Sequence, residues 1–183
     1  MDRPDFEHLL RAAAAITGQN EFVLIGSQSL LGQFPNAPSE LRTSDELDLI
    51  GTKPSLPGEP PFADLVDGTI GELSPFHRTF GYYGHGVGFE TAIFPEGWKD
   101  RAVRVRTPDT GGATGICMEV HDLAASKLAA GRPKDLMFVG QLLQHGLLRE
   151  DIAAERIAMM PVDSAMKATL GSRLVAARQM RTS

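Results

Sequence analysis

The chain has 183 residues, of which 42% are hydrophobic and 22% are charged, and its formal net charge at pH 7 is -5. This length and composition are ordinary for a globular protein with a sizeable core, and the acidic balance argues against broad, nonspecific binding to nucleic acid. The single cysteine, Cys117, excludes a disulfide within the chain and argues against a cysteine-based zinc site.

The start of the sequence has no basic segment followed by an apolar run, and no apolar run approaches the length of a membrane span. We therefore expect a cytoplasmic protein with no membrane partner. Two local clusters of basic residues could bind a phosphate or an RNA, although such clusters are more often solvated faces. These are Arg101, Arg104 and Arg106 in one cluster, and Arg132 and Lys134 in the other.

The first predicted elements are a helix and a strand. Apolar residues at helical spacing predict a helix over residues 6–17, which Gly18 ends. The apolar run over residues 22–25 predicts a strand that leads into Gly26-Ser27. A glycine allows the backbone to approach a ligand closely, and the N–H groups and hydroxyl of such a turn can hold a phosphate.

An acidic strand follows after a short predicted helix over residues 28–34. The sequence of residues 43–50 predicts a strand in which Glu46 and Asp48 are two residues apart. Side chains alternate along a strand, so both carboxylates project from the same face. Mg²⁺ prefers oxygen ligands and is often held by one or two carboxylates together with substrate phosphates. This spacing therefore predicts a metal clamp.

The middle of the chain contains weaker signals. Prolines predict a surface loop over residues 53–61, and a short helix is expected over residues 62–66. The glycine-rich run over residues 81–88 predicts a hairpin with turn and bulge glycines, leading to a strand over residues 86–93 that contains Glu90.

The last third of the chain is mainly helical by its pattern. Short strands are expected over residues 102–106 and 116–120, followed by a helix over residues 122–130 with Asp122 near its N-cap. A helix with Pro133 in its first turn comes next, and two more helices are expected within residues 149–182.

The order of strand, Gly26-Ser27 turn, helix and Glu46-Leu47-Asp48 strand resembles the nucleotidyltransferase superfamily. Within it, the chain is similar to small bacterial nucleotidyltransferase-like proteins of uncharacterised function that are related to the AbiEii toxin nucleotidyltransferases. These often read Ser-Glu-Asp-Leu-Asp where residues 44–48 read Ser-Asp-Glu-Leu-Asp. Residues 121–135 are similar to the Asp-Leu-x-x-x-Lys-Leu…Arg-x-Lys-Asp segment of the same relatives.

The resemblance implies an α/β fold of the polymerase β type, with a mixed sheet flanked by helices in residues 1–148 and a helical extension over residues 149–183 packed on the same domain. It implies Mg²⁺ held by Glu46 and Asp48, and transfer of an NMP from an NTP to a hydroxyl acceptor. The catalytic residues it implies are Glu46, Asp48, Glu90 and Lys127, and the nucleotide-binding residues are Gly26, Ser27, Asp45, Lys127, Arg132, Lys134 and Asp135.

Several alternatives stay open at this stage. Glu46 stands where these relatives usually have Asp, and Glu90 is the candidate for a third carboxylate, with Glu72 in reserve. A fold relative that binds a nucleotide or an antitoxin partner without turnover is the main alternative, and a metal-dependent phosphohydrolase is another. The acceptor could be RNA, protein or a small molecule, and the oligomeric state is open. No two histidines have metal-ligand spacing on one element, so each is interpreted as structural or exposed, with His77 also considered beside Glu72 in a pocket.

Overall fold

The computed structural model describes residues 1–180 and divides the chain into two compact units. The first unit contains Met1–Thr91 and Ala102–Cys117, and the second contains Ala92–Arg101 and the residues from Met118 onward. The chain therefore passes between the units after Thr91, Arg101 and Cys117, and not between residues 148 and 149, where the C-terminal extension was expected to begin. The last part of the expected C-terminal extension, residues 181–183, lies outside the described residues.

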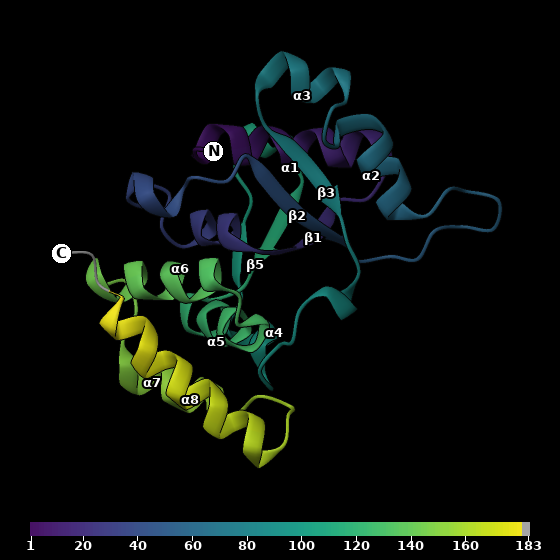
Figure 1. Cartoon of the computed structure of the whole chain (residues 1–183). Helices are drawn as coiled ribbons and strands as arrows, with labels where there is room; N and C mark the ends of the chain where they lie inside the picture. Colours follow the sequence, from purple (N-terminus) through teal and green to yellow (C-terminus); the bar gives the residue numbers. More distant parts are fainter. Residues whose placement is uncertain (181–183) are drawn as a thin grey trace. The chain divides into compact units, whose positions relative to one another are not determined.

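The first unit is built on a five-stranded mixed sheet in the order β3-β2-β1-β5-β4 (Figure 1). Its strands are β1 (Glu21–Ile25), β2 (Glu46–Gly51), β3 (Tyr83–Gly86), β4 (Val103–Val105) and β5 (Thr114–Cys117). The pairs β1–β5 and β2–β3 are parallel, whereas β1–β2 and β4–β5 are antiparallel. The expected α/β class, a mixed sheet flanked by helices, is confirmed at this level.

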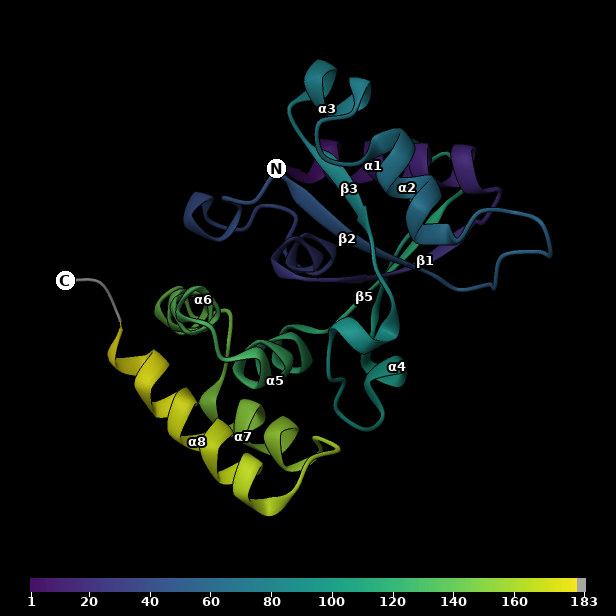
Figure 2. The same ribbon diagram turned by 45° about the vertical axis from the view of Figure 1, so that its right-hand side comes forward.

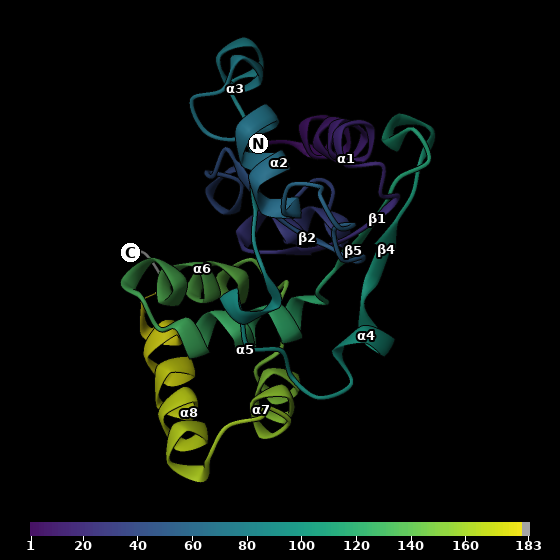
Figure 3. The same cartoon turned by 90° about the vertical axis from the view of Figure 1, so that its right-hand side faces the viewer.

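Two helices, α1 (Arg3–Thr17) and α2 (Phe62–Ile70), pack on one face of this sheet, and α3 (Pro75–Phe80) follows α2 (Figure 3). Alternate residues of β1 and β2 face these helices, and β1 is buried on its other face as well. The resulting core contains Phe6, Leu9, Leu10, Ala13, Phe22, Leu24, Leu47, Leu49, Val66 and Ile70. The opposite face of β2 carries Glu46 and Asp48, followed by the buried Ile50.

Helix α1 shows how local sequence sets an element's ends. The Asp2 carboxylate caps the first turn by accepting a hydrogen bond of 3.1 Å from the Asp5 N–H. The helix therefore begins at Arg3, three residues before the predicted start at residue 6. Gly18 adopts the left-handed conformation, with φ 67°, and its N–H bonds to Ala14. The predicted end at Gly18 is confirmed.

The segment after β2 differs most from expectation. The loop over residues 53–61 is confirmed, and the following helix continues to Ile70, beyond the predicted residue 66. The predicted hairpin and the predicted strand over residues 86–93 are wrong, because residues 83–86 form β3, a parallel partner of β2. After β3 the chain turns into a short 3-10 helix, Phe89–Thr91.

The glycines of β3 have a packing role, which corrects their interpretation as turn and bulge glycines. A Cβ on Gly84 would lie 2.9 Å from Leu49 and 3.1 Å from Ile70, and a Cβ on Gly86 would overlap the backbone of Ala63. Helix α2 can therefore approach β3 closely only where these positions have no side chain.

The remaining elements of the first unit are short, with three to six residues each. Residues 28–34, predicted as a helix, lie partly in a 3-10 helix over Ser27–Gly32, and β4 confirms the strand expected over residues 102–106. Two further 3-10 turns are Ser39–Leu41 and Pro108–Thr110.

The second unit is helical. It comprises α4 (Trp98–Arg101), α5 (Val120–Ala130), α6 (Pro133–Gln144), α7 (Glu150–Ala158) and α8 (Ser164–Gln179), and α5 to α8 pack against one another (Figure 2). A Cβ on Gly140 of α6 would lie 2.6 Å from the Ala177 carbonyl oxygen of α8, so these two helices are in close contact. The two helices expected after residue 149 are confirmed.

The start of α5 corrects two details of the sequence interpretation. The strand predicted over residues 116–120 ends at Cys117, since Glu119 caps α5 by accepting a 3.0 Å hydrogen bond from the His121 N–H. Asp122 lies in the first turn, near the N-cap as expected, and the helix begins at Val120, two residues before the predicted start. Within residues 1–180, no helix combines the length and the apolar character needed to cross a membrane.

Candidate functional site

Strand β2 presents two carboxylates on the face opposite the helices. Leu47 and Leu49 are fully buried against α1 and α2, whereas the side chains of Glu46 and Asp48 are 35% and 23% exposed. This alternation follows from the geometry of a strand. The predicted placement of Glu46 and Asp48 on one face of a strand is confirmed.

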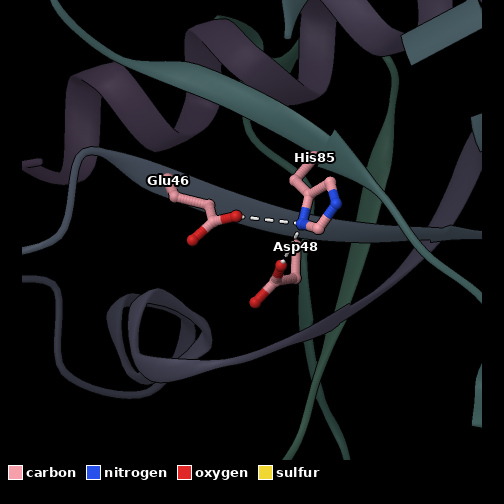
Figure 4. Close-up of side chains that lie close together, drawn as sticks. All are labelled: Glu46, Asp48 and His85. Atoms are coloured by element: carbon pink, nitrogen blue, oxygen red, sulfur yellow. Dashed lines mark hydrogen bonds and ion pairs between the residues drawn. The ribbon is translucent and has the colours of Figure 1, made fainter. Parts of the chain in front are cut away.

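A histidine from the neighbouring strand contacts both acids. His85 is the register partner of Asp48 in the parallel β2–β3 pair. Its Nδ1 lies 2.9 Å from Glu46 Oε1 and 3.1 Å from Asp48 Oδ1, and dashed lines in Figure 4 join this nitrogen to both carboxylates. Sequence reasoning treated His85 as structural or exposed and missed this contact.

The electrostatics of this cluster follow from the excess of carboxylates. Burial by itself lowers the pKa of His85, but the hydrogen bond to Asp48 and the charges of Asp48 and Glu46 raise that pKa above its ordinary value. Tyr83, on the same strand, has a raised pKa because of burial and the nearby Glu46 and Glu72. The field at this face of the sheet is therefore negative and favours a cation.

A hollow of about 280 Å³ opens beside the cluster. Its lining residues come from β2, α2, the turn after α2 and β3, and they are Glu46, Asp67, Glu72, Tyr83, Gly84 and His85. Glu72, the reserve candidate for a third acid, is thus at the hollow. His77 instead accepts a 3.0 Å hydrogen bond from the Leu73 N–H and packs its ring 4.7 Å from the ring of Tyr83.

The Gly26-Ser27 turn meets the acidic strand, as its position in the sequence predicts. Ile25, the last residue of β1, pairs with Asp48, and Gly26 has a φ of 72°. A Cβ on Gly26 would overlap Asp48 Oδ2, so the backbone can pass the carboxylate only with glycine at this position. Ser27 is partly exposed and begins the 3-10 helix after the turn.

Gln28 is the second residue of that 3-10 helix and has an unusual environment. Its side chain is 1% exposed, yet within the described part of the chain neither its amide oxygen nor its amide nitrogen has a hydrogen-bond partner. Burial of an amide without hydrogen-bond partners costs free energy of folding. Gln28 therefore lowers the stability of the fold next to the Gly26-Ser27 turn.

Glu90 does not join the acidic pair. It is an exposed residue of the 3-10 helix Phe89–Thr91, and its carboxylate folds back over Gly88. In the region that the structure describes, the group of side chains able to share a metal ion consists of Glu46, Asp48 and His85. The expected strand location of Glu90 is wrong because the chain leaves the sheet after β3.

Asp45 lies just before β2, and its carboxylate is 3.7 Å from the N-terminal amine of Met1. It is 62% exposed and is outside the group that could share a metal ion. A nucleotide-binding role for Asp45 therefore stays a prediction.

The other predicted binding residues belong to the second unit. The Asp135 carboxylate is 1% exposed and lies 3.3 Å from Lys127 Nζ and 2.7 Å from Arg132 Nε. Burial acts against its ionisation, but the hydrogen bond from Arg132 and the charge of Lys127 hold the pKa of Asp135 below its usual value. Lys134 is exposed at the start of α6. Asp135 thus forms ion pairs with Lys127 and Arg132, and the nucleotide-binding roles of these residues stay predictions.

The first basic cluster is divided between the two units. Arg101 donates two hydrogen bonds of 2.9 Å to the buried carboxylate of Asp122 in the second unit, whereas Arg104 in the first unit pairs with Glu21. Trp98 is 8% exposed and packs against Phe94.

No protein-family model matches this chain, and neither the curated proteins nor the solved structures contain a significant match. The resemblance to nucleotidyltransferases therefore stays a prediction that rests on the quoted residues.

The geometry of the site suits a divalent cation. The potential ligand atoms of Glu46, Asp48 and His85 all lie within 4.8 Å of one another. Two carboxylate oxygens and one imidazole nitrogen are all common metal ligands in proteins. The two strands that carry these side chains are paired in the sheet, so the backbone positions of the ligands are fixed before an ion binds.

Proposed function

We propose that the first unit carries out metal-dependent nucleotidyl transfer at the face of β2. The observation that carries this proposal is the meeting of three features at one place: the Glu46 and Asp48 carboxylates, and the Gly26 backbone packed against Asp48. A phosphate chain needs both a metal clamp and a close backbone approach, and this part of the sheet offers both.

In the proposed reaction, an acceptor hydroxyl attacks the α-phosphorus of an NTP in line with the leaving group. A bond forms between the acceptor oxygen and the α-phosphorus, while the O–H bond of the acceptor breaks and its proton passes to solvent. The bond from the α-phosphorus to the oxygen shared with the β-phosphorus breaks, and pyrophosphate leaves. Bound Mg²⁺ supplies charge neutralisation at the α-phosphate. Glu46 and Asp48 orient the metal-bound phosphate, while the N–H groups and hydroxyl of Gly26 and Ser27 hold the phosphate chain.

The first test is the binding of ATP, CTP, GTP and UTP by calorimetry, with and without Mg²⁺. Native protein is compared with Asp48→Asn and with Asp109→Asn, which changes an exposed acid of the same unit on a turn packed near α1. We expect Mg²⁺-dependent binding of at least one NTP, weakened at least about tenfold in Asp48→Asn and kept in Asp109→Asn.

Turnover is tested separately with NTP labelled at the α-phosphate. Label transferred to RNA, protein or a small hydroxyl compound, with release of pyrophosphate, identifies the acceptor class. If none of the four NTPs binds in a metal-dependent way to the folded native protein, the proposed function is wrong.

A second candidate function is the binding of a nucleotide or of a partner protein, such as an antitoxin, without turnover. One observation favours it: both carboxylates contact His85, and Glu90, the expected third acid, lies outside the cluster. Metal-dependent NTP binding without transfer of label to any acceptor class would support this candidate over the enzyme.

A further inference from the structure

We propose that Glu46, Asp48 and His85 form a three-ligand site that selects a divalent transition metal ion, such as Mn²⁺ or Co²⁺, over Mg²⁺. The inference deepens the proposed function and rests on it for the role of the ion, whereas the binding of the ion itself rests on the geometry of the three side chains.

The first support is the spacing of the donor atoms. His85 Nδ1 lies 2.9 Å from Glu46 Oε1 and 3.1 Å from Asp48 Oδ1. Adjacent ligands of an octahedral ion are about 3.0 Å apart when the bonds are about 2.1 Å long. Both nitrogen–oxygen separations are therefore those of neighbouring positions in such a shell, and the ligand atoms of all three side chains lie within 4.8 Å of one another.

The second support is that the sheet holds these ligands in place. Asp48 and His85 are register partners on β2 and β3, and Glu46 pairs with Tyr83 two residues earlier on the same two strands. Ligands on paired strands are positioned more precisely than ligands on loops. The Gly26 backbone, which follows β1, lies so close to Asp48 Oδ2 that a Cβ at this position would overlap it. The carboxylate of Asp48 is therefore also confined on this side.

The third support is the chemistry of the ligand set. Mg²⁺ takes oxygen ligands and loses its waters reluctantly, so two carboxylates bind it weakly without a phosphate. Imidazole suits the first-row transition ions, whose affinity for nitrogen ligands exceeds that of the hard cations. Adding His85 to the acidic pair therefore increases affinity for Mn²⁺ and Co²⁺ far more than for Mg²⁺. The hollow of about 280 Å³ beside Glu46 and His85 leaves room for further ligands, including a phosphate.

The competing explanation is that His85 only bridges the two carboxylates as an internal ion pair. In that case the imidazole would occupy the place of a cation and would reduce metal binding. The two explanations predict opposite effects of removing the imidazole, which makes the inference testable with metal salts alone.

The experiment titrates the full chain, without nucleotide, with MnCl₂, CoCl₂ and MgCl₂ in a calorimeter. The proteins are the native chain, His85→Gln and His145→Gln, which changes an exposed histidine at the end of α6. We expect native protein and His145→Gln to bind Mn²⁺ and Co²⁺ at least about tenfold more tightly than Mg²⁺. In His85→Gln, the affinity for Mn²⁺ and Co²⁺ falls at least about tenfold, whereas that for Mg²⁺ changes little.

Equal affinity for Mg²⁺ and Mn²⁺ in native protein, absence of Mn²⁺ binding, or tighter Mn²⁺ binding by His85→Gln would each overturn the proposal. Pulsed electron paramagnetic resonance of native protein with bound Mn²⁺ provides a test that needs no variant. Nitrogen modulation from a coordinated imidazole is expected, and its absence would show that His85 is not a ligand.

The metal titrations separate this inference from the proposed function. Selective Mn²⁺ binding without binding of any NTP would leave the metal site standing and remove the transferase proposal. Mg²⁺-dependent NTP transfer without selectivity for Mn²⁺ would support the transferase proposal and remove the proposed transition-metal site.

Discussion

Two pairs of carboxylates, one pair in each unit, are held in different ways. In the second unit, Asp122 and Asp135 are 0% and 1% exposed. Each is flanked by two permanent cations: Arg101 and Arg156 for Asp122, and Lys127 and Arg132 for Asp135. In the first unit, Glu46 and Asp48 keep 35% and 23% of their exposure and share one imidazole. A guanidinium group keeps its proton, whereas an imidazole can lose it. Glu46 and Asp48 in the first unit can therefore readily exchange their cation for another, unlike the two acids of the second unit.

This difference indicates which charges serve the fold and which serve a ligand. Burial raises the pKa of Asp122 in spite of the hydrogen bonds from Arg101, so its ionised form depends on the two guanidinium groups. Such a pair is costly to break. Partly exposed acids beside a histidine contribute little to folding, and their removal should affect binding instead.

The largest effect is expected for Asp122→Ala. Loss of this carboxylate leaves two guanidinium groups without their buried partner, and we expect a loss of about 3–5 kcal/mol in the free energy of unfolding. Urea denaturation followed by far-UV circular dichroism measures this loss. A cost below about 1 kcal/mol would mean that Asp122 is no more structural than the acids of β2.

Asp135→Asn comes next, with an expected cost of about 1–3 kcal/mol, because Arg132 is more exposed than the cations around Asp122. The pH dependence sharpens the result. The pKa of Asp135 is lower in the folded chain, so its contribution to stability is present above the ordinary value of 3.8 and is lost as pH falls through the lower folded value. Between pH 5 and pH 2, native protein should therefore lose more stability than the variant. An equal loss in both proteins would contradict the proposed pairing.

Gly26→Ala separates backbone strain from crowding at the site. Gly18 and Gly26 both have positive φ, of 67° and 72°, but a Cβ on Gly18 meets nothing within 4 Å, whereas one on Gly26 overlaps Asp48. We expect Gly18→Ala to cost about 1–2 kcal/mol and to leave metal binding unchanged. Gly26→Ala should cost at least as much and should also weaken Mn²⁺ binding, as measured by calorimetry. Equal Mn²⁺ affinity in the two variants would show that Gly26 does not shape the site.

The smallest effect on stability is expected for Asp48→Asn. The substituted residue is partly exposed and stands beside Glu46, so the change should alter the free energy of unfolding by no more than about 0.5 kcal/mol. Mn²⁺ binding should nevertheless be lost. If Asp48→Asn were as destabilising as Asp122→Ala in the same denaturation experiment, the distinction between the two units would fail.

The sequence predicted the parts of the site that are local. The run before Gly26 and the alternation through Glu46 and Asp48 both follow from short-range pattern, and both elements are present. His85 could not be found in this way, because its contact depends on a parallel pairing between strands separated by a loop and two helices.

The composition of β3 also hid it. Apolar or β-branched residues at alternate positions identify a strand, but the inward-facing positions of β3 are Gly84 and Gly86, where α2 leaves no space for a side chain. Glycines at such positions look like a turn in a sequence. The prediction of a hairpin there, and the search for a third acid at Glu90, followed from that ambiguity.

The distribution of two rare residues gives each unit its own intrinsic reporter. The only tryptophan, Trp98, is buried in the second unit, and the only cysteine, Cys117, is buried in the first. Burial raises the pKa of the Cys117 thiol to about 12, so at neutral pH this thiol stays protonated and unreactive until the first unit opens. The fluorescence of Trp98 follows the packing of the second unit instead. The native chain, without any substitution or dye, can thus show whether its sheet and its helices unfold together or one after the other.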